Sequence, residues 1–329
     1  MKYLFLRGQD PKDRNPTETH YNSLKECDDM WTMLFYNMLT KDDYGEIWYW
    51  GGKRLVKYAP NFIERRVSQF SNWKPTFEPD IILSRGGFNE YEPVMAKFPS
   101  AFKIYYGAHA KRFIPKTPYI RYNLILVDSP EQCLLVKRAL PTTPVAVLIK
   151  PAADNIIIPD LKAKKEYDVV FPANGTQPFK GHQFIFDTVP KDLKLLHLGF
   201  PFNYPSKSNI TSIRVLRKNI GKMYSKAKVG IVCPEAGYDS CPRVIPELML
   251  CNVPIIVTKT TNFWKDMYMN FYTGLLVNSR EDIWPAVRHI LKNLDIYKPA
   301  NHYNEYLSLS KASHYLLALI ENTKKGILL

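Results

Sequence analysis

The sequence predicts an α/β protein made of two Rossmann-like domains, each with a parallel sheet crossed by helices. Two observations support this fold class. Short apolar segments of strand length alternate with amphipathic segments of helix length along the chain, which is the pattern of parallel sheets with helical crossovers. With 329 residues, the chain is long for a single hydrophobic core and comfortable for two.

The first alternation occupies the amino-terminal half, and we assign residues 1–155 to the first domain. Helical spacing is clearest at 129–140, where Ser129 is a cap and Pro130 lies in the first turn. The other expected helices are 22–40 and 92–100, and the expected strands are 2–8, 46–51, 79–87, 101–109, 123–129 and 144–150.

Prolines and a charge cluster interrupt the rhythm at 150–168, where we expect the interdomain linker. A second alternation follows, and we assign residues 156–305 to the second domain and 306–329 to a carboxyl-terminal helix. The expected strands are 167–175, 193–200, 228–234, 253–258 and 273–277, and the expected helices are 182–189, 217–227, 244–251, 280–294 and 302–324.

Composition disfavours a membrane protein and a protein held by disulfides or zinc, and it indicates a basic surface. No apolar stretch approaches the roughly 18 residues that a membrane span needs, and we expect neither membrane insertion nor a signal peptide. The five cysteines include no C-x-x-C pair, which disfavours a disulfide framework or zinc site and favours a reducing cytoplasm. The formal net charge of +14 indicates either a basic surface without a polyanionic partner or a surface for phosphates, nucleic acid or anionic lipid.

The most informative motif is "YDSCPRVIPE" at 238–247. Asp239 follows an expected strand, and Glu247 lies about one turn into the next helix. Carboxylates bind hydroxyl pairs well, and backbone N–H groups at a helix start suit a diphosphate. Ser240, Cys241, Pro242 and Arg243 would form the phosphate-facing turn, although Pro242 itself donates nothing. In the alternative interpretation Asp239 only caps the helix and Glu247 pairs with a surface lysine.

Asp239-x7-Glu247, followed by "LMLCNVPIIVT", resembles the E-x7-E motif of the large retaining glycosyltransferase family 4, which has the GT-B fold. The segments "KMYSKAKVGIVCP" and "FPANGTQPFKGHQFIFDTV" are similar to that family as well. The resemblance covers about residues 150–295, and the first half matches mainly in architecture. It implies two Rossmann-like domains facing a cleft, a carboxyl-terminal helix that returns to the first domain, and transfer with retention at the anomeric carbon.

The resemblance also implies roles for individual residues. Lys180 would meet the donor diphosphate, Glu247 would hold the ribose hydroxyls, and Asp239 would hold a hydroxyl of the transferred sugar. His109, at an expected strand end, would position sugar or phosphate. Apart from the resemblance, Gly8 follows the first expected strand and would let the backbone approach the diphosphate. Each of these residues also has a purely structural interpretation. Lys180 would be an ordinary exposed lysine, Asp239 a helix cap, His109 a structural histidine and Gly8 a turn glycine.

Two departures from the family pattern stand out: the first carboxylate is Asp239 rather than glutamate, and Asn174 and Gly175 replace the usual arginine before the lysine. The chain contains no D-x-D triplet, which metal-dependent glycosyltransferases of the other major fold use to hold a divalent ion on the diphosphate. We therefore predict no metal, and no cofactor apart from the UDP-sugar donor substrate.

The acceptor is predicted from basic residues of the first domain, namely Lys53, Arg54, Arg85, Lys111 and Arg112. Aromatic residues are interleaved with them: Trp48, Tyr49, Trp50, Trp73, Tyr105 and Tyr106. Basic residues with aromatics suit a nucleic-acid backbone and an unstacked base, and the alternative is a solvated basic face above core aromatics. The expected helix 22–40 carries Glu26, Asp28 and Asp29 on its polar face, which disfavours an anionic membrane.

In its compact length, its high usage of Lys, Tyr and Asn and its expected basic cleft, the chain resembles bacteriophage DNA hydroxymethylpyrimidine glycosyltransferases. That resemblance implies double-stranded DNA with hydroxymethylated bases as acceptor, UDP-glucose or UDP-arabinose as donor, and the host cytoplasm as compartment. Two alternatives stay open. One is a transferase that acts on an envelope lipid, polysaccharide or protein, and the other is a catalytically silent module that only binds nucleic acid. Nothing in the sequence sets an oligomeric state.

Overall fold

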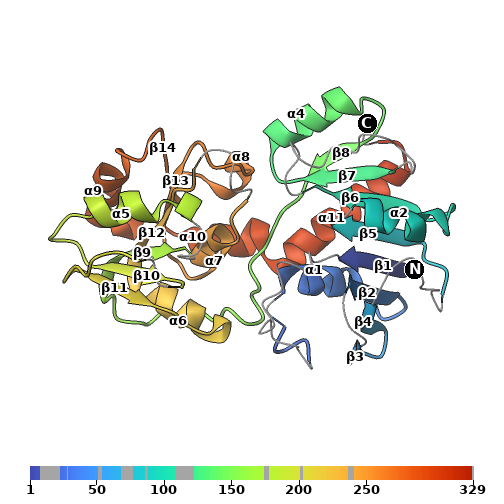
Figure 1. Ribbon diagram of the computed structural model, residues 1–329, viewed down its shortest axis with the longest axis horizontal. Helices are drawn as coiled ribbons and strands as arrows, with labels where there is room; N and C mark the ends of the chain where they lie inside the picture. The colour runs from blue at the N-terminus through green and yellow to red at the C-terminus, as the bar shows by residue number, and fades with distance from the viewer. Residues whose placement is uncertain are drawn as a thin grey trace. The chain divides into compact units, whose positions relative to one another are not determined.

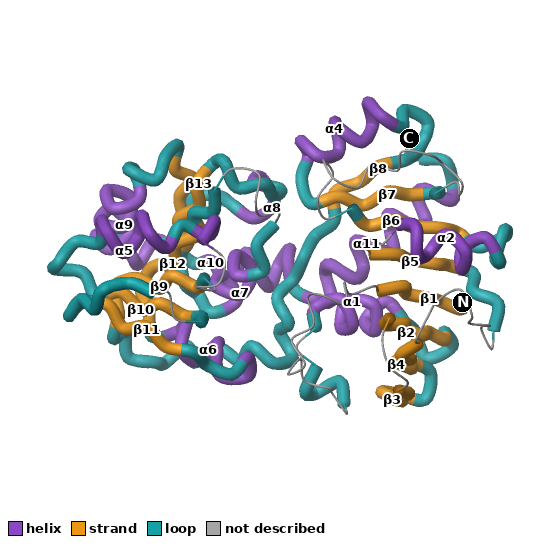
Figure 2. Tube along the Cα trace, in the orientation of Figure 1, coloured by secondary structure: helices purple, strands orange, loops and turns teal. Residues whose placement is uncertain are grey.

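A computed structural model gives the fold (Figures 1 and 2). It describes residues 1–7, 23–27, 29–50, 54–67, 77–85, 88–107, 122–173, 178–200, 203–235 and 241–327. The chain divides into two compact units, Met1–Ile149 with Ser313–Leu329, and Lys150–Ala312. Each unit contains one sheet of mostly or entirely parallel strands, so the predicted α/β class is confirmed.

The first unit is built on an eight-stranded sheet in the order β3-β4-β2-β1-β5-β6-β7-β8. Its strands are β1 (Lys2–Arg7), β2 (Tyr44–Trp50), β3 (Arg54–Ala59), β4 (Phe62–Val67), β5 (Ile81–Arg85), β6 (Phe102–Tyr106), β7 (Leu124–Val127) and β8 (Val145–Val147). All neighbouring pairs are parallel except β3 with β4. The prediction lacks this hairpin, because charged residues interrupt the apolar pattern of "RLVKYA" and "FIERRV".

Three helices of the first unit are α1 (Met30–Met38), α2 (Phe88–Ala96) and α4 (Pro130–Ala139). Helix α1 is shorter than predicted: Glu26 precedes it, and Asp29 caps it by accepting the Thr32 N–H. Most residues of α1 are buried, and Phe35 stacks on Phe5 of β1 with ring centroids 5.3 Å apart. The predicted amphipathic helix with an acidic polar face is therefore wrong, and α1 is a core helix.

The second unit is built on a six-stranded parallel sheet in the order β11-β10-β9-β12-β13-β14. Its strands are β9 (Tyr167–Pro172), β10 (Leu195–Leu198), β11 (Ile210–Ile213), β12 (Ala227–Val232), β13 (Ile255–Thr258) and β14 (Gly274–Val277). Strand β11 is absent from the prediction, since its four residues include Thr211 and Ser212 at the solvent-facing edge of the sheet.

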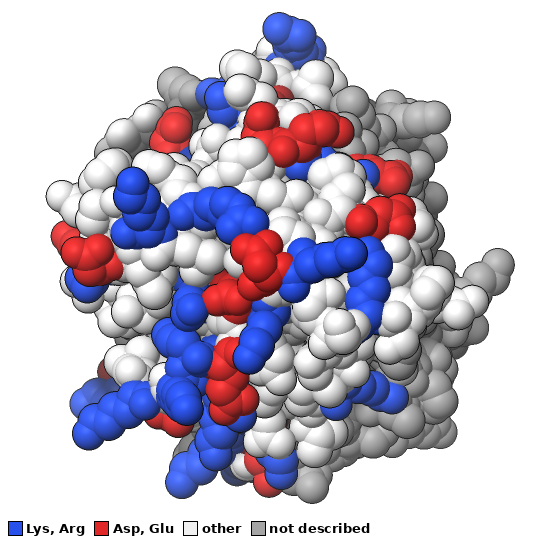
Figure 3. Space-filling model, turned by 90° about the vertical axis from the view of Figure 1, so that its left-hand side faces the viewer, with Lys and Arg blue, Asp and Glu red and all other residues white. Residues whose placement is uncertain are grey.

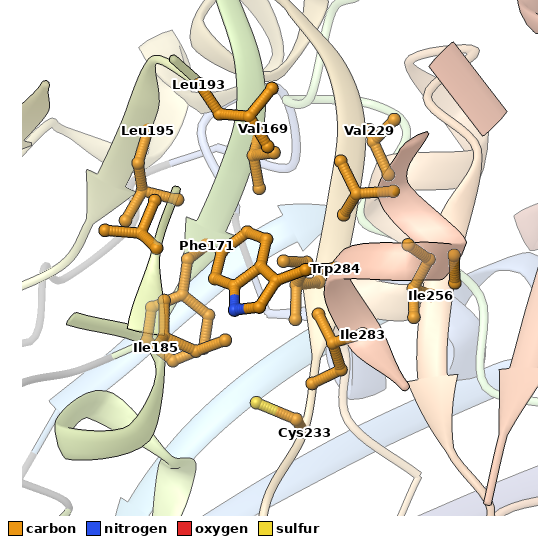
Figure 4. Close-up of a cluster of buried hydrophobic side chains, with 14 of the residues drawn as sticks. Val169, Phe171, Ile185, Leu193, Leu195, Val229, Cys233, Ile256, Ile283 and Trp284 are labelled. Carbon is orange, nitrogen blue, oxygen red and sulfur yellow. The ribbon is translucent and has the colours of Figure 1, made fainter. Parts of the chain in front are cut away.

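The helical elements of the second unit cover both faces of its sheet. They are η2 (Pro178–Lys180), α5 (His182–Thr188), η3 (Arg217–Asn219), α6 (Ile220–Ser225), α7 (Val244–Leu250), α8 (Lys265–Tyr268), α9 (Ile283–Lys292), η4 (Leu294–Ile296), α10 (Pro299–His302) and η5 (Tyr303–Leu307). Figure 4 shows the core between the sheet and helices α5 and α9, with the Trp284 indole beside Phe171 and Ile283. The Trp284 Nε1–H donates to Thr188 Oγ1 at 2.8 Å, which ties α9 to α5.

The last predicted helix, 302–324, is interrupted. A π-helical turn, η5, ends before Ser308, and α11 (Leu309–Lys324) begins after it. From Ser313 onward the chain belongs to the first unit, where Ser313 Oγ donates to the Leu34 carbonyl at 3.4 Å and the Tyr315 hydroxyl donates to the Val147 carbonyl at 3.2 Å. The carboxyl-terminal helix thus returns to the first unit, as the resemblance implies.

Candidate active site

The turn after β9 places Lys180 at the carboxyl edge of the second sheet. Gly181 follows it with φ of +93°, and a Cβ there would lie 2.7 Å from the Cys233 carbonyl oxygen. Only glycine fits this left-handed conformation and close approach without strain. The Glu235 N–H donates to the Phe179 carbonyl at 2.7 Å. The backbone around Lys180 is therefore fixed against the end of β12, where ligands bind in open parallel sheets.

The predicted phosphate-facing turn is described from Cys241 onward. Cys241 has φ of +44°, and its N–H donates to the Asn262 carbonyl at 2.6 Å. Cys241 and Pro242 are buried, whereas Arg243 is exposed directly before α7. The Cys241 N–H is thus already used within the fold and Pro242 has no N–H. Of these three residues, only Arg243 is both exposed and charged, so it is the one that can meet an anion.

Glu247 lies inside α7 and is fully buried. Arg217 of η3 donates to both of its carboxylate oxygens, and the Tyr224 hydroxyl donates to Oε2 at 3.2 Å. The Glu247 side chain is 1% exposed and that of Arg217 is 24% exposed. The alternative of a surface lysine partner is wrong, since the partner is a half-buried arginine. The ribose contact stays a prediction, and it requires the carboxylate to exchange one of these partners for hydroxyl groups.

Several predicted site residues lie outside the described residues: Gly8, Lys53, His109, Lys111, Arg112, Asp239 and Ser240. The backbone of Arg54 is described as the first residue of β3, but its side chain is not. The roles of these residues stay predictions.

The carboxyl edge of the first sheet carries a cluster that sequence reasoning missed. Arg7 ends β1 and donates to the carboxylate of Asp29 and to the Tyr49 hydroxyl at 2.6 Å, while Asp29 Oδ2 accepts the Thr32 hydroxyl at 2.7 Å. Burial alone would raise the pKa of Asp29, but Arg7, the Thr32 hydrogen bonds and Arg85 outweigh burial and lower it. An arginine that ends an apolar strand was the available sequence signal, but its partner is 22 positions away.

Arg85 is placed beside this cluster by the register of the sheet. Arg7 pairs with Tyr49 on one side and with Arg85 on the other, and the Arg85 guanidinium lies 5.2 Å from the centre of the Trp31 ring. Two arginines therefore end the neighbouring strands β1 and β5. The strand order reverses between these strands, which is where open α/β sheets bind ligands.

The predicted aromatic surface is largely wrong. Trp48, Tyr49, Tyr105 and Tyr106 are buried in the first unit, and the basic residue Arg65 pairs with the buried carboxylate of Glu46 at 3.2 Å. The Trp50 side chain and Trp73 lie outside the described residues. Strand periodicity places alternate side chains on opposite faces of a sheet, and helices cover both faces here. These four aromatics are therefore core residues rather than stacking platforms.

Two further properties concern membranes and metals. In the part of the chain that the structure describes, no helix combines the length and apolar character needed to cross a bilayer. The same described residues contain no group of three or more His, Cys, Asp and Glu side chains arranged to hold a metal ion.

Two buried histidines lie next to the Lys180 turn. His182 of α5 and His197 of β10 have ring centroids 5.2 Å apart, and both are fully buried. His197 Nε2 lies 2.8 Å from the Ala173 carbonyl and therefore carries the proton, so Nδ1 accepts from Ser212 Oγ at 2.7 Å. Burial, followed by the neighbouring His197, lowers the pKa of His182 to about 4.

This depressed pKa predicts a loss of stability in mild acid. The unfolded chain binds a proton at His182 below about pH 6.5, whereas the folded chain does so only near pH 4. The contribution of neutral His182 to the free energy of unfolding is therefore complete above pH 6.5 and is lost as the pH falls toward 4. Between pH 7 and pH 5 the free energy of unfolding should fall by about 2 kcal/mol. Urea unfolding at both pH values should show this loss in the wild type and a smaller one in His182→Gln. An equal loss in the two proteins would contradict the prediction, and His289→Gln, an exposed site in the same unit, is the control.

Comparison with solved structures gives the fold family. A sucrose-phosphate synthase (tll1590) from Thermosynechococcus elongatus has a TM-score of 0.69 at 12% identity and covers 99% of this chain and 100% of its own. A glycosyltransferase from Rickettsia africae ESF-5 has a TM-score of 0.65 at 14% identity, with 98% and 99% coverage. T4 phage BGT, solved with its substrate UDP-glucose, has a TM-score of 0.58 at 12% identity over the full length of both chains.

No protein-family model and no curated protein matches the sequence. Identities of this size establish architecture rather than activity. The two sheets, their parallel order and the returning helix, together with these full-length similarities, show that the chain has the GT-B fold.

Proposed function

We propose that the chain is a glycosyltransferase that uses a UDP-sugar donor. The observation that carries this proposal is the locked turn at Lys180, whose glycine can approach the end of β12 only because it lacks a Cβ. Such a turn fixes the backbone of Lys180 at the carboxyl edge of a parallel sheet, where ligands bind. Two structures with the same fold, T4 phage BGT and Anabaena Alr3699/HepE, are described as complexes with UDP-glucose.

In this proposal the donor lies against the second unit. Lys180 and the exposed Arg243 neutralise the diphosphate, Asp239 holds a hydroxyl of the sugar, and His109 positions sugar or phosphate. We propose retention without a metal. The acceptor hydroxyl attacks the anomeric carbon on the face that the diphosphate leaves, the bond from that carbon to the phosphate oxygen breaks, and the hydroxyl proton passes to the leaving diphosphate.

We further propose DNA with hydroxymethylated bases as the acceptor. The net charge of +14 favours a polyanion, and a structure described as the DNA-modifying enzyme beta-glucosyltransferase shares the fold at a TM-score of 0.56. On the face in Figure 3, Lys and Arg are interspersed with Asp and Glu. Among the described basic residues of the first unit, we propose Arg85 for DNA binding.

A second acceptor class is an envelope lipid, polysaccharide or protein. The burial of Trp48, Tyr49, Tyr105 and Tyr106 favours it, because it removes the aromatic surface on which an unstacked base would lie. A glycosyltransferase of this second class would use the same donor site.

The test is transfer from a panel of labelled UDP-sugars to DNA with hydroxymethylcytosine and to plain DNA. We expect label only in the modified DNA. If neither DNA is labelled, DNA is not the acceptor, and release of the nucleotide would still show that the protein uses the donor. Absence of UDP binding and of nucleotide release with every UDP-sugar would leave a silent module and contradict the proposed enzyme.

Lys180→Ala should weaken UDP binding by about 1–3 kcal/mol, because a charged hydrogen-bond donor to the diphosphate is lost. Calorimetric titration with UDP measures this change. Lys191→Ala, at an exposed lysine of the same unit, is the matched control and should bind UDP like the wild type. Unchanged affinity in Lys180→Ala would exclude the lysine from the donor site.

A further inference from the structure

Arg280 brings a second cation to the Lys180 turn. It lies three residues beyond the end of β14, and its Nη2 donates to the Cys233 carbonyl at 3.0 Å. The same nitrogen lies 3.4 Å from the position that a Cβ on Gly181 would occupy. The turn after β9, the end of β12 and the segment after β14 therefore meet around one glycine, and two cationic residues flank it.

Arg280 has no carboxylate at ion-pair distance among the residues that the structure describes, and its guanidinium donates one hydrogen bond, to Cys233. The exposed Glu281 beside it is held mainly by hydrogen bonds to its own backbone and to Ser279, which lower its pKa, and Arg280 adds a weaker lowering of that pKa. A guanidinium has five N–H donors in a planar fork, so this half-buried group keeps most of its donor capacity. Burial raises the pKa of the adjacent Cys233 thiol to about 12, so that thiol stays neutral and contributes no countercharge.

We propose that Arg280 binds the diphosphate of the nucleotide-sugar donor together with Lys180. The inference rests on the proposed function and assigns a specific residue to it. Two cations beside one turn repel each other unless an anion lies between them, and a diphosphate supplies at least two negative charges. After β9 this sequence has Asn174 and Gly175 in place of the usual arginine. In this proposal the second cation is Arg280, which follows the carboxyl end of β14.

The test compares the binding of UDP, UMP and uridine to the wild type, Arg280→Gln and Arg280→Lys by calorimetric titration. Arg280→Gln should weaken UDP binding about 10- to 100-fold, weaken UMP binding less and leave uridine binding unchanged. Arg280→Lys should recover part of the UDP affinity, because it restores the charge without the fork. The melting temperature should stay close to that of the wild type.

Arg288→Gln is the matched control, because Arg288 is an arginine of the same unit, in α9, and forms an exposed ion pair with Asp192 at 3.0 Å. Equal losses for UDP and uridine in Arg280→Gln would mean that the arginine is only structural and would overturn the inference. Undiminished UDP binding in Arg280→Gln would also overturn it, while the proposed function would stand on the wild-type titration. A wild type that binds neither UDP nor UMP would overturn both.

Discussion

Replacing Glu247 with glutamine is expected to lower the free energy of unfolding by about 2–4 kcal/mol. The substitution removes the charge from a fully buried carboxylate that accepts hydrogen bonds from Arg217 and Tyr224. Breaking a buried ion pair by removing one partner leaves the other charge uncompensated, which costs about 3–5 kcal/mol when both groups are dry. The 24% exposure of the Arg217 side chain lets water recover part of that loss.

Urea unfolding of Glu247→Gln, Arg217→Met and the double variant measures this effect as a coupling energy between the two residues. Arg288→Gln breaks an ion pair that is 54% and 63% exposed and serves as the comparison, with an expected loss of about 0–1 kcal/mol. A loss in Glu247→Gln as small as that of Arg288→Gln would show that the Arg217 pair does not support the fold.

The donor role of Glu247 is separable from this structural role. If its carboxylate holds ribose hydroxyls, the wild type should bind UDP more tightly than 2′-deoxy-UDP, and Glu247→Gln should lose that preference. Equal weakening of both nucleotides would instead mean that Glu247 acts through Arg217 and the local fold. The buried geometry makes this comparison more decisive than a single UDP affinity, because loss of α7 packing would weaken both nucleotides alike.

The fold could be predicted because parallel strands that are buried on both faces have continuous apolar sequences, such as "IILS" in β5 and "IIVT" in β13. The β3–β4 hairpin and the edge strand β11 lack such runs and could not be predicted, whereas the edge strands β8 and β14 are apolar and were predicted. The break at Ser308 carries no proline or glycine, which explains why the last helix was predicted as continuous.

The candidate site could be predicted only where the chemistry is local in sequence. Lys180 and Gly181 are adjacent, and their turn could be predicted from that pair. Arg217 lies 30 positions from Glu247, and Arg280 lies 47 positions from Cys233. Neither arginine belongs to a recognisable spacing, because the sheet order and not the sequence brings these pairs together. Composition also could not show which face of a strand an aromatic residue occupies.

Replacing Gly181 with alanine is expected to lower stability by about 2–5 kcal/mol and to weaken UDP binding with it. A φ of +93° costs an L-residue about 1–2 kcal/mol. The new Cβ would also lie 2.7 Å from the Cys233 carbonyl oxygen and 3.0 Å from its Sγ, and overpacking of this kind costs about 1–3 kcal/mol. The backbone oxygen cannot yield without moving the end of β12.

Gly326→Ala separates these two contributions. Gly326 has φ of +70°, but no described atom lies within 4 Å of a Cβ built there, so only the backbone term applies. Urea unfolding should therefore show a smaller loss for Gly326→Ala, and UDP titration should show none. Because a shifted turn in Gly181→Ala would displace the backbone that carries Lys180 and the carbonyl that anchors Arg280, its loss of UDP affinity should exceed that of either single cation variant. If the Gly181→Ala protein unfolds like Gly326→Ala and binds UDP normally, the close approach of Gly181 to Cys233 has no part in donor binding.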